Sequence, residues 1–288
     1  MSNLSIDISG KIDPDRVSVL RGIKEVADAL GVKFLMVGAF ARDLVFEHIH
    51  QIPAPRSTRD IDLGVEVSSW EEYRRLIEAL VGRGILKETR LPHRFTGPAS
   101  VIVDIVPYGG ISGEAKRISW PPEHDVVMNM LGFEEAYRFA LKVRIDNNPA
   151  LDIQVPSVPA IAVLKVVSWD DAYPARERDA QDLLFILENY FKTGIEDELY
   201  VAHADLLVEE GYDTRLASVR LLGRDIARML SRDGVEAVTA ILSRETDEDK
   251  GHRMLSQMVK GSASGSARFE DALQLLKKLM QGIQQEVG

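Results

Sequence analysis

Residues 33–67 read KFLMVGAFARDLVFEHIHQIPAPRSTRDIDLGVEV. The apolar run from Lys33 to Val37 ends at Gly38, after which apolar residues recur at helical spacing from Phe40 to His50. A loop with prolines follows, and residues 60–67 then alternate between apolar and polar as a strand does. The sequence therefore predicts a strand, a glycine turn, a helix and a second strand in succession.

The second strand contains two carboxylates, Asp60 and Asp62, two positions apart. Side chains at positions i and i+2 of a strand point to the same face, so we expect the two carboxylates side by side. The same Asp-x-Asp spacing occurs at residues 13–15 and 247–249, but there in polar, turn-like sequence. A carboxylate pair within an apolar strand is costly unless it serves a site. We therefore interpret Asp60 and Asp62 as ligands for Mg²⁺ or Mn²⁺, which prefer oxygen donors and serve chemistry on phosphates.

A third carboxylate is expected from a later strand. Residues 101–106 read VIVDIV, a strongly β-branched run that we expect to end at Pro107, with Asp104 in its middle. Asp104 would join the metal site and help to deprotonate an attacking hydroxyl. Asp152 has the same local pattern on a weaker strand, so the sequence leaves both candidates open. We favour Asp104, because the stronger strand suits a central position next to the first pair.

Gly38 closes one strand and opens a helix. At such a turn, exposed backbone amides and the positive end of the helix dipole can meet the phosphates of a nucleoside triphosphate. A glycine between a strand and a helix is also common where it only forms a tight turn and binds nothing. Gly38 gains functional weight here only because the carboxylate pair follows on the next strand.

The first half of the chain continues with mixed elements. Helical spacing runs from Val17 to Leu30, and again to Val81 after Ser69, a residue suited to a helix N-cap. Shorter strands are expected at residues 141–145 and 151–155.

From Ser157 onward almost all of the sequence has helical texture. The small-residue stretch GSASGS, residues 261–266, is expected to be a flexible turn or linker. The predicted fold class is α+β. A head with a mixed sheet and helices, residues 1–156, would precede a helical domain, residues 157–288.

Lys165 lies in an almost wholly apolar helix predicted over residues 158–167. A single lysine there either extends to solvent or points at an anion, and we favour the anion because so apolar a helix is buried on most sides. Asp179 and Asp182 are three apart on the next predicted helix and share a face. With Arg176 and Arg178 nearby, a structural network of ion pairs is the alternative to a binding role.

A row of arginines recurs every four residues towards the C-terminal end. It could form a basic path for an RNA or protein acceptor, or a solvated helix face, and we slightly favour the solvated face. The row consists of Arg220, Arg224, Arg228 and Arg232, preceded by Arg215.

The composition limits the classes of function. A formal net charge of -10 argues against a protein that grips long nucleic acid by many Lys and Arg contacts to phosphate. Cysteine is absent, so any metal must bind to oxygen or nitrogen. The N-terminal residues lack the features of a signal peptide, and no apolar stretch has the length of a membrane span. We therefore expect a cytoplasmic protein with no membrane partner.

Four segments together resemble a known family. They are VGAFARDL (residues 37–44), RSTRDIDLGV (56–65), VDIVPYGG (103–110) and LKVVSWDDAYPARERDAQDLL (164–184). Their order is similar to that in the nucleotidyltransferase superfamily related to DNA polymerase beta, where a glycine turn precedes Asp-x-Asp and a later strand aspartate. More narrowly, they resemble the AbiEii type of nucleotidyltransferase toxin, over roughly residues 33–190.

This resemblance implies a role for each matching residue. Gly38 with Ala39 would hold the phosphate turn, Asp60 and Asp62 would bind the metal, and Lys165 would contact the triphosphate. Asp179 or Asp182 would complete the helical motif. Ala39 stands where the superfamily usually has Ser or Gly, and Arg178 stands where many relatives have lysine.

The resemblance also implies an activity. We expect a metal-dependent transfer of a nucleotide from a nucleoside triphosphate to a hydroxyl of RNA or protein, with a cognate antitoxin as a further partner. One alternative is a catalytically degenerate relative that binds a nucleotide or a partner, because Ala39 has no hydroxyl for the phosphate. Another is a metal-dependent phosphoesterase.

Overall fold

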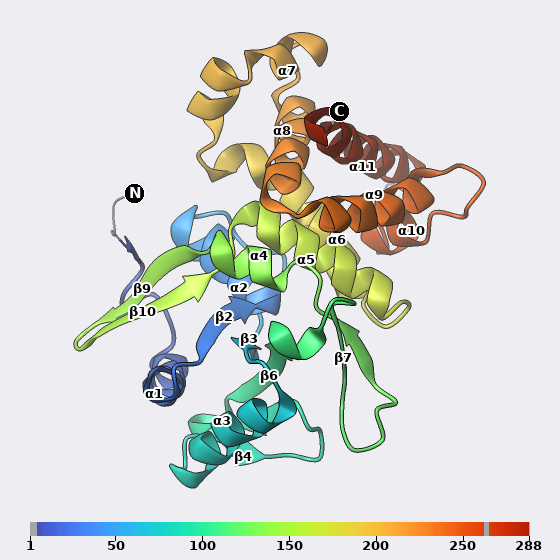
Figure 1. The fold of residues 1–288 in the computed structure, drawn as a ribbon. Helices are drawn as coiled ribbons and strands as arrows, with labels where there is room; N and C mark the ends of the chain where they lie inside the picture. The colour runs from blue at the N-terminus through green and yellow to red at the C-terminus, as the bar shows by residue number, and fades with distance from the viewer. Residues whose placement is uncertain (1–4, 262–264, 288) are drawn as a thin grey trace. The chain divides into compact units, whose positions relative to one another are not determined.

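The N-terminal part of the chain is built on a five-stranded mixed sheet in the order β2-β3-β6-β5-β4. Its strands are β2 (Lys33–Val37), β3 (Ile61–Glu66), β4 (Lys87–Glu88), β5 (Arg94–Thr96) and β6 (Ile102–Tyr108). β3 pairs antiparallel with β2 and parallel with β6, so the Asp-x-Asp strand lies inside the sheet. The strands expected near residues 33–37, 60–67 and 101–106 are thus confirmed as direct neighbours (Figure 1).

Smaller sheets and helices complete this part of the chain. The remaining strands form a sheet in the order β1-β9-β10 and a separate β7-β8 pair: β1 (Ile6–Asp7), β7 (Arg117–Ser119), β8 (Val127–Asn129), β9 (Leu141–Asn147) and β10 (Ala150–Val155). The helices are α1 (Pro14–Leu30), α2 (Gly38–Asp43), its π-helical continuation η1 (Leu44–Ile49), α3 (Trp70–Gly82), α4 (Phe133–Arg138), and the 3-10 turns η2 (Pro98–Ser100) and η3 (Gly110–Ser112).

The computed structural model describes residues 5–261 and 265–287, and it divides into two units, Met1–Ser157 and Val158–Gly288. We had expected the division between residues 156 and 157. The first unit combines sheets with helices and the second is helical, which confirms the predicted α+β class.

Helix caps explain where two helices begin. The side chain of Asp13 accepts hydrogen bonds from the backbone N–H groups of Asp15 and Arg16, so α1 starts at Pro14, earlier than the expected Val17. The side chain of Ser69 accepts from Glu72 N–H at 3.2 Å, which confirms Ser69 as the N-cap of α3.

Alternation along β3 separates the core from the carboxylates. Ile61, Leu63 and Val65 are buried, with exposed fractions of at most 1%, whereas Asp62 between them is partly exposed. Tyr73 of α3 donates a hydrogen bond to the carbonyl oxygen of Ile105 in β6 at 2.9 Å, so α3 is tied to the sheet. The pleat of the strand thus turns Asp62 away from the apolar face.

The expected end of β6 at Pro107 is wrong. The strand continues to Tyr108, and Pro107 pairs in register with Val65 of β3. A proline cannot donate to the ladder, but the carbonyl oxygen of Tyr108 accepts from Val67 N–H at 2.9 Å and carries the pairing past it.

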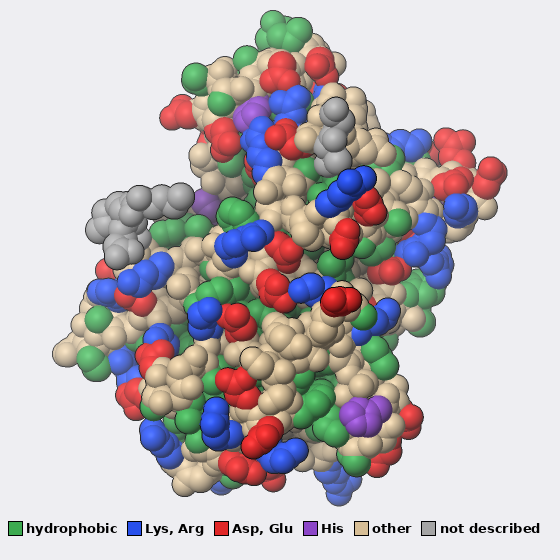
Figure 2. All heavy atoms as spheres, in the orientation of Figure 1, with side chains coloured by type: hydrophobic (Ala, Val, Ile, Leu, Met, Phe, Trp, Pro, Cys, Tyr) green, Lys and Arg blue, Asp and Glu red, His purple; other side chains and the backbone are tan. Residues whose placement is uncertain are grey.

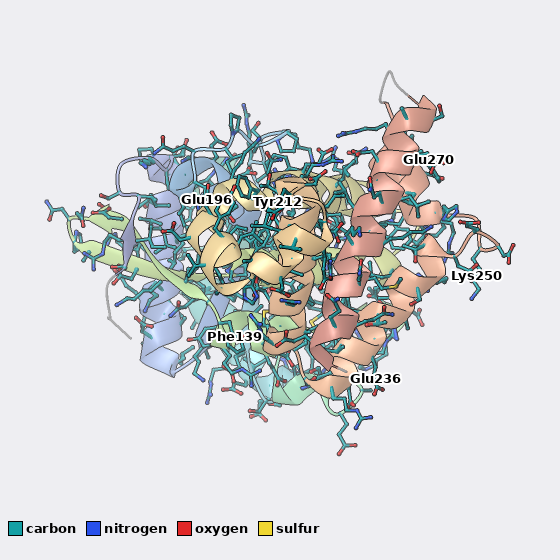
Figure 3. The ribbon with its side chains drawn as sticks, turned by 90° about the horizontal axis from the view of Figure 1, so that it is seen from above. Phe139, Glu196, Tyr212, Glu236, Lys250 and Glu270 are labelled. Carbon is teal, nitrogen blue, oxygen red and sulfur yellow. The ribbon has the colours of Figure 1, made fainter. Side chains whose placement is uncertain are left out.

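The second unit is helical throughout the part that the structure describes. Its elements are α5 (Val158–Asp171), α6 (Glu177–Asn189), η4 (Tyr190–Thr193), η5 (Glu198–Ala202), α7 (Ala204–Glu209), α8 (Thr214–Met229), α9 (Arg232–Thr246), α10 (Arg253–Met258) and α11 (Gly265–Val287). Of the stretch expected to be a flexible turn, residues 262–264 lie outside the described residues. Gly265 and Ser266 belong to α11, so the turn was wrong for those two. Figure 3 shows α11 beside α9, with Glu270 and Glu236 labelled on these two helices.

The arginines of the row, on α8 and at the start of α9, are paired with carboxylates and do not form a basic path. Arg220 is 1% exposed and binds Glu209 and Glu210, because α7 and its following turn pack against α8. The other members of the row are also paired with carboxylates: Arg215 with Asp271, Arg224 with Asp205, Arg228 with Glu286 and Arg232 with Glu236. The basic path is therefore wrong, whereas the solvated face holds for part of the row, because Arg232 is 85% exposed and Arg228 is 42% exposed. In Figure 2, Lys and Arg are interspersed with Asp and Glu over the visible face.

Two glycines allow α8 and α11 to pack backbone against backbone. A Cβ atom at Gly282 would lie 2.0 Å from the carbonyl oxygen of Arg220, and one at Gly223 would lie 2.3 Å from that of Leu279. No side chain fits at either distance, and the obstructing atoms are main chain, which cannot rotate aside.

We predict that Gly282→Ala lowers the free energy of unfolding by about 3 kcal/mol, the upper end of the usual cost of overpacking. Urea unfolding followed by circular dichroism measures this change. Gly82→Ala is the control, because it lies at the end of α3 with nothing within 4 Å of the added Cβ. It should leave stability unchanged or raise it by up to about 1 kcal/mol. Equal changes in the free energy of unfolding for the two substitutions would contradict the backbone-to-backbone packing of α8 and α11.

Candidate active site

Asp60 and Asp62 lie at the start of β3, as the sequence analysis placed them. Asp60 directly precedes the strand and Asp62 is its second residue, and both are partly exposed. In the ladder, Asp62 stands opposite Val37 at the end of β2 and opposite Asp104 of β6. The pair therefore lies at the point where β2 ends and α2 begins.

Gly38 makes room for the carboxylate of Asp62. Its φ is +70°, and a Cβ atom there would lie 2.1 Å from Oδ2 of Asp62. The carboxylate thus rests against the bare backbone at the first residue of α2. Glycine is required at this position twice, for its left-handed conformation and for this close approach.

The loop before Asp60 is fixed by charged side chains that the sequence analysis did not single out. Arg42 is fully buried, pairs with Asp43, and donates to the carbonyl oxygen of Arg56 at 2.8 Å. Asp43 accepts from the backbone N–H of Thr58, and Arg16 donates to the carbonyl oxygen of Thr58 at 2.7 Å. Burial raises the pKa of Asp43, although Arg42 opposes the shift. These contacts hold the chain on its way into β3.

Asp104 is the third carboxylate of the group. It stands opposite Asp62 on one side and opposite Arg94 of β5 on the other. Nε of Arg94 donates to Oδ1 of Asp104 at 2.7 Å, and Nη2 donates to Oδ2 at 2.6 Å. These hydrogen bonds are the main cause that raises the pKa of Arg94, and the negative charges of Asp104, Asp60 and Asp62 add to it.

Asp152, the rival of Asp104, belongs to a different sheet. It lies in β10, where Arg144 donates to it through two nitrogens and Lys142 approaches to 3.1 Å. The Arg144 hydrogen bonds are the main cause that lowers its pKa to about 2. Of the two candidates, the structure therefore brings Asp104 next to Asp62.

Lys165 points at carboxylates within its own unit. Its ammonium group lies 2.6 Å from Asp179 and 2.8 Å from Asp182, and all three side chains are buried. Burial alone would lower the pKa of Lys165, but the two aspartates outweigh it and raise the pKa. The same ammonium group holds the pKa of Asp179 below its usual range against the effect of burial. Arg176 is 3.7 Å from Asp179, so the structural network of ion pairs, given above as the alternative to a binding role, is present. A contact of Lys165 with a triphosphate stays a prediction from the family resemblance.

The donor set at β3 suits a hard divalent cation held by two carboxylates. Asp60 and Asp62 would offer oxygen ligands, and the missing side chain of Gly38 makes room for the Asp62 carboxylate. Asp104 faces Arg94 instead. Accordingly, no group of three or more His, Cys, Asp or Glu side chains arranged to hold a metal ion occurs among residues 5–261 and 265–287.

Two kinds of signal explain what the sequence analysis missed. Arg42 and Asp43 are adjacent charges in an otherwise apolar segment, FARDLVF, and that contrast marks them as buried and paired. Arg94 gave no such signal, because β5 is only three residues long and is flanked by polar residues.

The sequence profile of one family, described as nucleotidyl transferase AbiEii toxin of a Type IV toxin–antitoxin (TA) system, matches residues 21–275. The chain belongs to this family. The resemblance drawn from the four segments is thereby confirmed, and membership of this nucleotidyl transferase family supports a transferase. A search of the curated proteins finds no match to the chain.

Solved structures of distant similarity include two kinds of protein. The antibiotic-resistance factor ANT(2'')-Ia is 14% identical, with a TM-score of 0.35, over 70% of this chain and 99% of its own. A CCA-adding enzyme in complex with ATP is 13% identical, with a TM-score of 0.32, over 91% of this chain and 66% of its own. The Thermotoga maritima CCA-adding enzyme with tRNA is 12% identical, with a TM-score of 0.27, over 97% of this chain and 83% of its own.

None of the helices that the structure describes is both long and apolar enough to cross a membrane.

We predict that Gly38→Ala displaces the carboxylate of Asp62 and reduces nucleotidyl transfer by at least about 100-fold, because the added methyl group would overlap Oδ2. Gly31→Ala is the matched control, since Gly31 also has a positive φ, +70°, but nothing lies within 4 Å of its added Cβ. For both variants, the transfer of a labelled nucleotide from a nucleoside triphosphate and the melting temperature are measured. The account is supported if both variants lose a similar amount of stability but only Gly38→Ala loses nucleotide transfer. Full transfer by Gly38→Ala contradicts it.

Proposed function

We propose that this AbiEii family protein transfers a nucleotide from a nucleoside triphosphate to a hydroxyl of RNA or protein, with a divalent cation held by Asp60 and Asp62. The observation that carries the proposal is the position of Asp62, packed against the backbone of Gly38 and opposite Asp104. The glycine turn and the two aspartates thereby lie together within the first unit, which supports a role of both in binding the triphosphate.

The residues of the chain would divide the work as follows. Asp60 and Asp62 would hold Mg²⁺ or Mn²⁺, which when bound polarises the phosphates and neutralises the leaving pyrophosphate. The backbone of Gly38 and Ala39 would orient the phosphates. Asp104 would accept the proton of the attacking hydroxyl, but Arg94 now occupies both of its oxygens. Departure of Arg94 would free both oxygens of Asp104 to accept that proton.

We predict that the wild-type protein, incubated with each α-³²P-labelled triphosphate, Mg²⁺ and cell lysate, moves label into macromolecules. Asp62→Asn should reduce this transfer by at least about 100-fold, because the cation loses a charged ligand. Asp249→Asn is the control, since Asp249 belongs to another Asp-x-Asp pair and is exposed. Sensitivity of the label to ribonuclease or to protease identifies the acceptor. Chelation of the metal should abolish transfer.

The same assay separates the alternatives. Ala39 supplies no hydroxyl to a phosphate, and this favours a relative that binds nucleotide without turnover. In that case the triphosphate binds, no pyrophosphate appears, and wild type and Asp62→Asn give equal, background label. Hydrolysis of a phosphodiester without added triphosphate identifies a phosphoesterase instead. For a toxin-like activity, induced wild type should arrest the growth of its host, whereas Asp62→Asn should not.

A further inference from the structure

Arg94 and Asp104 form a two-pronged ion pair across β5 and β6. Both oxygens of Asp104 accept from one guanidinium group, at 2.7 and 2.6 Å, and the two residues stand directly opposite in the ladder. This fork geometry is the strongest arrangement that a carboxylate and an arginine can adopt. Asp104 therefore has its preferred acceptor positions filled.

The guanidinium group of Arg94 places a positive charge beside the carboxylates of the site. Asp62 and Asp104 are opposite each other on neighbouring strands, whose backbones lie about 4.8 Å apart, and like charges placed so repel. Arg94 offsets that repulsion from the far side of Asp104.

Arg94 is also accessible to a substrate. Its side chain is 38% exposed, against 15% for Asp104. Nη1 makes no hydrogen bond to any residue that the structure describes, so one edge of the guanidinium is open to another anion. A planar guanidinium binds phosphate oxygens in the same forked manner as a carboxylate.

We propose that Arg94 is a built-in counter-cation that competes with divalent metal for Asp104 and releases Asp104 when it transfers to the phosphates of the substrate. The proposal deepens the proposed function of the site and rests on it. Arg94 is then a positioning residue for Asp104, which becomes available to metal and to the acceptor hydroxyl only after the exchange. No bond other than hydrogen bonds and ion pairs changes in this step.

Binding of Mn²⁺ to the full chain without nucleotide tests the first half of the proposal. Arg94→Gln should tighten Mn²⁺ binding by about tenfold, because a positive charge leaves and a carboxylate is released. The gain should vanish in the double variant Arg94→Gln with Asp104→Asn. Arg90→Gln removes the same charge from an exposed residue with no ion pair among the described residues, and should change the dissociation constant less than about twofold.

Binding of a non-hydrolysable triphosphate with Mg²⁺ tests the second half. Arg94→Gln should weaken it by about tenfold, the cost of losing a forked contact to phosphate. A gain for metal and a loss for triphosphate in the same variant support the exchange. A purely structural ion pair predicts a lower melting temperature with metal binding unchanged or weakened, and that result overturns the proposal.

Two controls keep these results interpretable. Arg94→Lys retains the positive charge but cannot form the forked contact, so it should tighten Mn²⁺ binding by less than Arg94→Gln does. If Arg94→Gln does not fold, Arg94→Lys is used in its place. In that case, unchanged Mn²⁺ binding by Arg94→Lys overturns the proposal. The Mn²⁺ titration needs no turnover, so failure of label transfer by wild type rejects the proposed function separately.

Discussion

Parallel pairing of β3 with β6 sets Asp62 directly opposite Asp104, and Asp60 lies two residues before Asp62 on the same strand. Two unit charges about 5 Å apart repel by about 3 kcal/mol at an effective dielectric constant of about 20. A fold of marginal stability keeps such a register only if cations offset the repulsion. Arg94 supplies one positive charge through its fork to Asp104, and a divalent cation held by Asp60 and Asp62 would supply more.

The surroundings of the site make this register rigid. The core face of β3 is fully buried, and Tyr73 ties α3 to the backbone of β6. On the approach to β3, Arg42 and Arg16 bind carbonyl oxygens of the preceding loop. The carboxylates are therefore held by packing on one face and by buried hydrogen bonds along the chain. Such preorganisation of the carboxylates suits electrostatic catalysis, and Arg94 is the charged group that would move when substrate binds.

Local pattern was enough to predict the strands of the site and to favour Asp104 as the partner of the first pair, but not to predict the residue that faces Asp104 on its other side. Alternation placed Asp62 and Asp104 on strands because each lies among β-branched or apolar residues. The register between them spans about forty residues and depends on tertiary packing, so nothing in the sequence predicts that Arg94 faces Asp104. The arginines of α8 were misread for the same reason, because their partners come from α7 and α11. Lys165 was expected to point at an anion, and the structure supplies Asp179 and Asp182 of its own unit.

Anomalous scattering from crystals of the wild-type protein grown with Mn²⁺ and a non-hydrolysable triphosphate measures the central claim most directly. The account predicts a manganese ion about 2.1 Å from carboxylate oxygens of both Asp60 and Asp62, with the phosphates beside Gly38. Manganese and triphosphate bound away from these residues, or triphosphate bound with no metal at Asp60 and Asp62, contradicts it.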